Sequence, residues 1–217
     1  MSNIILPQTI YSKSIVEATY KTVNLIMNKG KLGKDERGET VRYYKHIINI
    51  IPVDCCEDSD NLLTFLCGKA FADNLITGKP SGEGLQAHDY TYGEELHFDD
   101  GLEKTIELLS EHPETRRAVY LFKPKHVGGK EVPCMIQTVF DIESDEDDDF
   151  LNITIPGRSN ECAIAMKSDI KGFAELTKYV AKRLGIKTGI LLLHDINAHC
   201  RINSDMGEIK RILKAGY

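Results

Sequence analysis

Apolar residues recur every three to four positions in several stretches of the chain, and this spacing predicts amphipathic helices. Ser12 or Ser14 is placed to cap the first of these helices, and Gly30 is placed to end it. The predicted helices cover residues 12–29, 60–77, 101–111, 169–184 and 206–214.

Shorter runs rich in β-branched and aromatic residues predict strands between these helices. They cover residues 46–53, 117–122, 135–142, 150–155 and 189–196. The polar, glycine-bearing stretch 30–44 is typical of a loop, and residues 78–84 are typical of a turn-rich link. The acidic run 143–149 indicates a solvated hairpin connection, with a metal site as the weaker interpretation.

The order of these elements predicts one α+β domain over residues 1–217, built on a mixed β-sheet flanked by helices. The composition is that of an ordinary globular protein, with 41% hydrophobic and 28% charged residues. The net charge of -6 argues against a nucleic-acid polymer as partner, so any phosphate contact must come from locally placed arginines.

No apolar run is long enough to cross a bilayer, and the N-terminus lacks the pattern of a secretory signal, so we expect no membrane association and a cytoplasmic location. The 6 cysteines have no framework spacing and are expected to be reduced. A metal site at Cys55, Cys56 and Cys67 has little support, because their spacing fits no standard zinc pattern.

Cys134 stands out because it follows a proline at the head of an apolar strand, in the stretch VPCMIQ. A buried small hydrophobe is the ordinary interpretation of such a cysteine, but nearby cations would favour the nucleophilic thiolate. Arginines at loops and strand ends suit surface positions equally well, yet a guanidinium can also give a phosphate two parallel hydrogen bonds. The candidate phosphate-binding residues are Arg37, Arg116, Arg117, Arg158 and Ser159.

Taken together, several motifs resemble those of the thymidylate synthase family. TYGEELHF, ETRRAV, VPCMIQTVFDI, GRSNECAIAMKSDIKGFAEL and DINAHCRIN follow one another in the family's order and at roughly its spacings. The resemblance runs over residues 37–203 and is strongest over residues 158–199, where no insertion is needed. The short chain looks most like the compact form of the family found in methanogenic archaea.

The resemblance implies a thymidylate synthase-like fold, a homodimer formed through the sheet, and one-carbon transfer to C5 of a pyrimidine nucleoside monophosphate. By similarity, Cys134 is the nucleophile that adds to C6, and Tyr92 lines the catalytic pocket. The one-carbon donor implied is a methylene-carrying reduced pterin, either 5,10-methylenetetrahydrofolate or methylenetetrahydromethanopterin. The resemblance does not extend to the family's long C-terminal segment over the pterin, which weakens the expectation of ordinary folate.

The remaining site residues follow from the same resemblance. Arg37, Arg158 and Ser159 match positions that hold the 5'-phosphate, whereas Arg116 and Arg117 match arginines that reach the phosphate of the neighbouring subunit. The final match concerns the sugar, since His199 corresponds to the histidine near the 3'-hydroxyl group.

Four positions depart from the family pattern, and they are Met135, Arg201, Asn61 and Asp169. Met135 replaces the usual histidine after the cysteine, and Arg201 replaces the tyrosine that partners the sugar histidine. Arg201 could reach a 2'-hydroxyl group or a phosphate. The general base stays unassigned, because Asn61 occupies its register; the nearby carboxylates are Glu57, Asp58 and Asp60.

Asp169 replaces an asparagine that pairs with uracil, and cytidylate hydroxymethylases of the family carry aspartate at this position. A carboxylate faces the lone pairs of uracil O4, whereas it accepts from cytosine N4, and one shared proton would complete the pair at N3. Capping of the following helix through Ile170 is the simpler interpretation of Asp169. The alternatives to dUMP methylation are therefore a dCMP or CMP hydroxymethylase and, in another class, a nucleotide-binding regulatory protein without catalysis.

Overall fold

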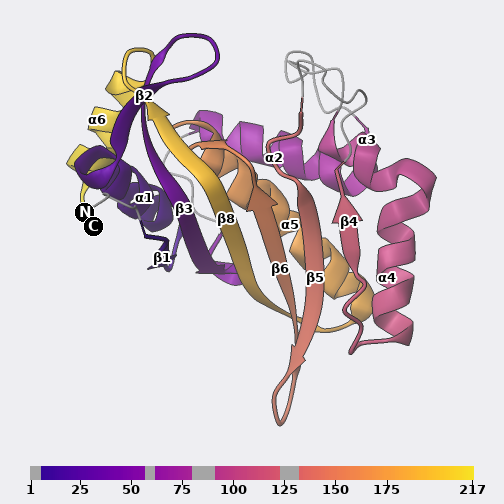
Figure 1. Cartoon of the computed structure of the whole chain (residues 1–217). Helices are drawn as coiled ribbons and strands as arrows, with labels where there is room; N and C mark the ends of the chain where they lie inside the picture. Colours follow the sequence, from indigo (N-terminus) through magenta and orange to yellow (C-terminus); the bar gives the residue numbers. More distant parts are fainter. Residues whose placement is uncertain (1–5, 57–61, 80–90, 123–131) are drawn as a thin grey trace.

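The computed structural model describes residues 6–56, 62–79, 91–122 and 132–217, and of residues 62–65 only the backbone (Figure 1). One mixed eight-stranded sheet runs through these parts of the chain. Its main path runs in the order β1 (Gln8–Tyr11), β3 (Thr40–Pro52), β8 (Lys187–Arg201), β6 (Asp149–Gly157), β5 (Gln137–Ser144) and β4 (Val119–Leu121), while β2 (Lys31–Lys34) pairs with β3 and β7 (Asn160–Glu161) pairs with β8. The predicted α+β class and mixed sheet are confirmed.

Helices cover one face of this sheet, and α5 lies along its centre with α2 beside it (Figure 1). All the predicted helices are present, and α3 is an additional short one. The helices are α1 (Ile15–Lys29), α2 (Leu62–Thr77), α3 (Tyr92–His97), α4 (Gly101–Glu111), α5 (Ala165–Leu184) and α6 (Met206–Ala215), and single 3-10 turns span Val53–Cys55 and Phe98–Asp100. Ser14 is the residue that caps α1, since its hydroxyl accepts a hydrogen bond from the Glu17 N–H at 3.1 Å.

Two sequence-based boundaries were wrong. Residues 30–44 form not a loop but β2 and the start of β3, paired as an antiparallel hairpin around a tight turn in which Asp35 accepts from two backbone N–H groups. Helix α5 begins at Ala165 instead of residue 169, because Glu161 accepts the N–H groups of its first residues. Pairing of β2 with β3 decided the first boundary, and capping by the Glu161 side chain decided the second.

The face of the sheet turned toward the viewer in Figure 1 carries no helix from the described part of the chain. A row of residues crosses five strands in register on this face, and each member is half-buried or exposed. The row is Ile50, Leu192, Thr154, Val139 and Val119. It is mostly apolar, so one side of the sheet presents a continuous hydrophobic band.

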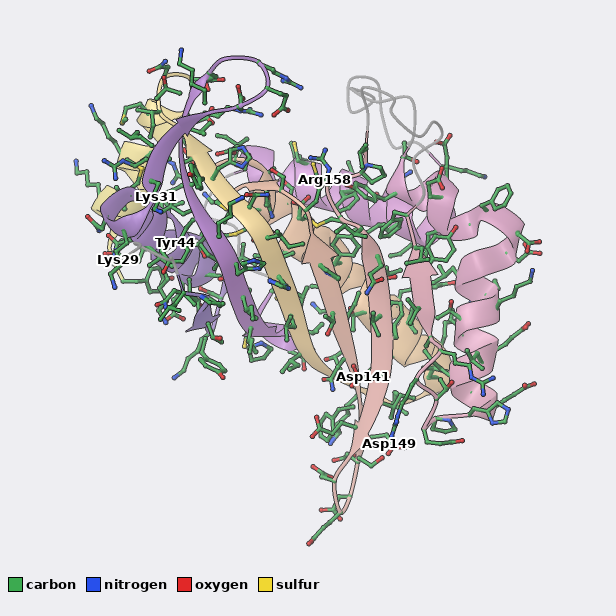
Figure 2. All side chains as sticks on the ribbon, in the orientation of Figure 1. Lys29, Lys31, Tyr44, Asp141, Asp149 and Arg158 are labelled. Carbon is green, nitrogen blue, oxygen red and sulfur yellow. The ribbon has the colours of Figure 1, made fainter. Side chains whose placement is uncertain are left out.

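The acidic run 143–149 forms the predicted hairpin turn between β5 and β6. Asp141 and Asp149 lie toward this turn, whereas Arg158 lies beyond the other end of β6 (Figure 2). Within the residues that the structure describes, no three possible metal ligands gather. The helices among them include none with the length and apolarity that crossing a membrane requires.

Candidate active site

Cys134 lies just before β5, where the chain runs antiparallel to the end of β6. The N–H of Arg158 donates to the Cys134 carbonyl at 2.7 Å, and the Ile136 N–H donates to the Pro156 carbonyl at 2.9 Å. These two bonds fix the backbone on either side of Met135, which is fully buried, while Cys134 itself is exposed. The predicted nucleophile is therefore held by the sheet and remains accessible.

Tyr92, on α3, contacts the same backbone segment. Its hydroxyl accepts a hydrogen bond from the Met135 N–H at 3.0 Å. Thr91 and Glu94 form a capping box that starts α3 and so places Tyr92 at its first position. The ring packs edge-on against Phe122 with 4.9 Å between centroids. Tyr92 thus supports Met135, the residue that follows the predicted nucleophile.

Arg158 binds the chain just before the cysteine. Its Nε lies 3.1 Å from the Pro133 carbonyl oxygen, and one terminal nitrogen donates to the Val132 carbonyl at 2.7 Å. These carbonyl contacts use one edge of an exposed guanidinium. The other edge is directed away from them, which suits an anionic ligand.

The surroundings of the Cys134 thiol act on its pKa in both directions. Partial burial raises this pKa, and the positive charge of Arg158 opposes the rise. Asp169, Glu36 and Asp195 add to the increase through their negative charge. The net direction is upward, opposite to the expectation that neighbouring arginines would favour the thiolate. Among the described residues of one chain that act on this pKa, three carboxyl groups stand against one cation.

Ser159 and His199 lie side by side next to Arg158. The Ser159 Oγ is 3.5 Å from His199 Nδ1, and burial lowers the pKa of His199, which favours the neutral imidazole. Arg201 faces Glu39, with 3.8 Å between its Nε and a carboxylate oxygen. A chain carboxylate therefore already lies beside Arg201, the predicted sugar-site arginine.

The remaining arginines occupy two different places. Arg37 lies in the turn between β2 and β3, and the charge of neighbouring Glu36 acts on both Cys134 and His199, so this turn faces the site. Arg116 and Arg117 are exposed just before β4, where Phe140 pairs with Ala118. Ala118, which follows the two arginines, thus lies beside Phe140 inside β5, whereas Cys134 precedes the first residue of β5. The structure groups Arg158 with Cys134 and separates Arg116 and Arg117 from it within one chain.

Asp169 lies in the second turn of α5, not at its start. Glu161 makes the capping contacts instead, accepting from the N–H groups of Ala163 at 3.0 Å and Ile164 at 2.6 Å. The interpretation of Asp169 as a helix cap is therefore wrong. Its residue is half-buried, and desolvation together with the charges of Asp195 and Glu161 raises the pKa of its carboxyl group.

Three polar residues near Asp169 were not predicted from the sequence. Glu161, Asn160 and Asp195 are all buried. Burial raises the pKa of Glu161 to about 7, and its backbone hydrogen bonds oppose that rise. For Asp195 the strand pattern held a usable indication: Leu191 and Leu193 are buried on the helix-covered face, and Asp195 is the next residue with that alternation.

The candidates for the general base, Glu57, Asp58, Asp60 and Asn61, lie outside the described residues. Of the cysteines with the minor metal interpretation, Cys56 is buried, and burial raises the pKa of its thiol to about 12. Such a thiol is a poor metal ligand at neutral pH.

Comparison with known proteins adds to this geometry. The sequence profile of the thymidylate synthase family matches residues 77–213. A protein of Methanococcoides burtonii is 32% identical and one of Methanosarcina mazei is 31% identical, each alignment covering 94% of both chains, and both carry the name "Putative thymidylate synthase". A deoxyuridylate hydroxymethyltransferase of Pseudomonas phage M6 is 32% identical over 55% of this chain and 35% of its own length.

Proposed function

We propose that this chain, which belongs to the thymidylate synthase family, transfers a one-carbon unit to C5 of a pyrimidine deoxynucleoside 5'-monophosphate, in the manner of dUMP methylation. Cys134 is the nucleophile of this reaction, and Arg158 and Ser159 bind the phosphate. His199 lies where the sugar would follow. The second substrate is a reduced pterin, 5,10-methylenetetrahydrofolate or methylenetetrahydromethanopterin, which supplies the one-carbon unit.

The chemistry proposed for the chain begins at sulfur. Cys134 loses its proton and its sulfur adds to C6 of the pyrimidine, which leaves the electron pair on C5 as an enolate. C5 then forms a bond to the donated carbon, the hydrogen on C5 departs as a proton, and the bond between the donated carbon and the pterin nitrogen breaks. The Cys134 sulfur is eliminated as the carbon left on C5 takes up hydride from the reduced pterin, giving methyl, or hydroxide from water, giving hydroxymethyl.

The observation that carries the proposal is the placement of an exposed thiol between two rigid supports. Tyr92 holds the Met135 N–H on one side, and the Arg158 guanidinium holds the Val132 and Pro133 carbonyls on the other. A phosphate bound at the free edge of Arg158 would bring the rest of the nucleotide toward Cys134. Phosphate binding would also give a role to the positive charge of Arg158, since the other described groups that act on Cys134 by charge are carboxyl groups.

A homodimer of single-domain chains completes the site in this proposal. The apolar row from Ile50 to Val119 faces outward from the uncovered side of the sheet, and Arg117 lies two residues before Val119 at the end of that row. Two copies packed through this face would bury the row. Each copy would then offer Arg116 and Arg117, which are separated from their own Cys134, to the phosphate site of the other.

The second candidate function differs in its product, a hydroxymethyl group, or in its substrate, a cytosine nucleotide. A relative named as a deoxyuridylate hydroxymethyltransferase supports the hydroxymethyl product, and the aspartate at position 169 supports dCMP or CMP as substrate. A regulatory protein that binds the nucleotide without catalysis is a third reading, and it differs from both enzymes in having no use for the Cys134 thiol.

The test is release of tritium from C5 of labelled dUMP, dCMP, UMP and CMP, with each pterin as donor. An enzyme of this class releases label and, with 5-fluoro-dUMP and pterin, forms a covalent adduct at Cys134. Cys134→Ser abolishes both, whereas the matched control Cys55→Ser, at a half-buried cysteine of the 3-10 turn, leaves both intact. Nucleotide binding with neither label release nor adduct would refute the enzyme and leave the regulatory protein.

A further inference from the structure

Asp195 is a buried carboxyl group directly beneath the nucleophile segment. It is 0% exposed, and neither of its carboxyl oxygens makes a hydrogen bond to any residue that the structure describes. A side-chain carbon placed on Gly157 would lie 3.3 Å from Asp195 Oδ1 and 3.6 Å from the Cys134 carbonyl oxygen. The glycine therefore leaves space through which the carboxyl group approaches the strand that carries Cys134.

Asn160 connects this carboxyl group to Asp169. Its side-chain amide, on a residue that is 2% exposed, is close enough to lower the pKa of both aspartates. Its Nδ2 nevertheless lacks a hydrogen bond of normal geometry within the described residues. Two carboxyl groups therefore share one neutral amide in a buried pocket, with Asp169 on the side that a ligand can reach.

We propose that Asp195 and Asp169 hold one proton between them beside Asn160, so that the group presented to the pyrimidine ring is a neutral carboxylic acid. Asp195 is in this view a positioning residue, which acts on the base through Asp169 and not by contact. The inference rests on the proposed nucleotide function, because it assigns the state of the base-binding group of that same site.

Electrostatics of the pocket support the shared proton. Desolvation has the largest effect on Asp169, and among the described residues the charged groups that act on it are Asp195 from β8 and Glu161 from β7, both carboxyl groups. Cys134, in the segment before β5, is the neighbouring thiol, and the negative charges of Asp169 and Asp195 raise its pKa. Arg158 is engaged with backbone carbonyls. Two like charges in a buried pocket cannot both be present cheaply, so one proton is retained.

A neutral acid changes which bases the site accepts. Its O–H can donate to O4 of uracil while its carbonyl accepts from N3–H, which is the pattern of the asparagine that the family usually carries here. Turned over, the same group donates to N3 of cytosine and accepts from N4–H. An ionised Asp169 leaves one of the two edges facing lone pairs with either base, at a loss of roughly tenfold to a hundredfold in affinity. The aspartate is therefore compatible with dUMP.

The experiment measures the affinity of dUMP and dCMP by calorimetry between pH 7 and 9, in the full chain without pterin, because in this range the phosphate keeps its second negative charge and uracil largely keeps its N3–H proton. A carboxyl group with a raised pKa keeps its proton below that pKa and loses it as the pH rises, so affinity should be full at low pH and fall on the alkaline side. Asp195→Asn removes the neighbouring charge, and the fall should move to lower pH by about one pH unit or more. Asp169→Asn needs no proton, so its affinity for dUMP should lose this alkaline fall.

Glu111→Gln is the matched control, because it removes one exposed carboxylate from the end of α4 and should leave the profile unchanged. An alkaline fall that survives Asp169→Asn, or one that Asp195→Asn does not move, would overturn the inference. Infrared titration reads the proton without a ligand, with Glu161→Gln to remove the other buried carboxyl group of the pocket: a carboxylic-acid band that persists at neutral pH in this variant supports the shared proton, and its absence refutes it. If neither nucleotide binds at any pH, the proposed function fails, while the infrared result still decides the proton.

Discussion

Removing one hydroxyl group from Tyr92 should weaken the support of the nucleophile without disturbing the packing around it. In Tyr92→Phe the Met135 N–H loses its acceptor at 3.0 Å, and Met135 is only 1% exposed, so water cannot easily replace it. An unpaired buried N–H group costs about 1–3 kcal/mol. The ring contacts with Phe122 and Phe71 are kept, because phenylalanine fills the same space.

The cost should appear in two measurements. The free energy of unfolding in urea should fall by about 1–3 kcal/mol. The rate of Cys134 adduct formation with 5-fluoro-dUMP should fall about tenfold for each 1.4 kcal/mol by which the positioned backbone is loosened. Both effects follow from the same lost bond, since it holds the residue next to the sulfur.

Tyr44→Phe is the matched control. Tyr44 is also buried, and its hydroxyl donates to the Leu6 carbonyl at 3.0 Å, on the α1 side of the sheet and away from Arg158 (Figure 2). This variant should lose stability and form the adduct at the wild-type rate. The reasoning is refuted if Tyr92→Phe matches the wild type in both measurements, or if the two variants slow adduct formation equally.

Three further predictions test other parts of the site. Glu161→Ala should lower the free energy of unfolding by about 1–2 kcal/mol in urea titrations, because it removes the acceptor at the start of α5, whereas Glu161→Gln keeps an acceptor oxygen and should cost less. Arg158→Gln should slow alkylation of Cys134 by iodoacetamide at fixed pH, measured by peptide mass spectrometry, because loss of the charge raises the thiol pKa further; an unchanged or faster rate would contradict this. Mixing inactive Cys134→Ser with inactive Arg117→Ala should restore label release through mixed dimers that contain one intact site; no recovery would count against arginine sharing.

The elements with strong periodicity were predictable from the sequence, and those defined by partners were not. The buried strands and the long helices repeat their apolar pattern over many residues, which is why their existence was clear. Helix α3 covers only Tyr92–His97 and is too short to show a period. Its start was still readable, since Thr91 and Glu94 have the spacing of a capping box. The hairpin of β2 was hidden because it depends on pairing with β3.

The accessible residues of the candidate site could be proposed from the sequence, whereas its buried residues could not. Cys134, Arg158 and Ser159 were proposed from motifs that are contiguous in sequence, and the structure brings Cys134 and Arg158 together. Asp195 was missed because its meaning depends on which face of β8 it occupies. Beside Asp195 the alternation of inward-facing and outward-facing residues shifts by one position. On β8 both Asp195 and Ala198 point inward, and they pair with Ile47 and Tyr44 of β3. Between Tyr44 and Ile47, His46 adopts a left-handed φ of 59°. Strict alternation of buried and exposed residues therefore does not predict burial across this position in either strand.

The division of charge within the site follows from how Arg158 is held. A guanidinium free to move would turn toward the buried carboxyl groups and neutralise them, and the pocket would then have no reason to keep a proton. The Val132 and Pro133 carbonyls instead keep Arg158 at the outer edge of the site. A phosphate can meet the cation there, while Asp169 and Asp195 remain without a counter-charge from Arg158 at the inner end, where a base would lie. The segment 158–169 carries both Arg158 and Asp169, so in the proposed site the phosphate and the base would meet the same piece of chain, while Asp195 on β8 would set the proton on Asp169.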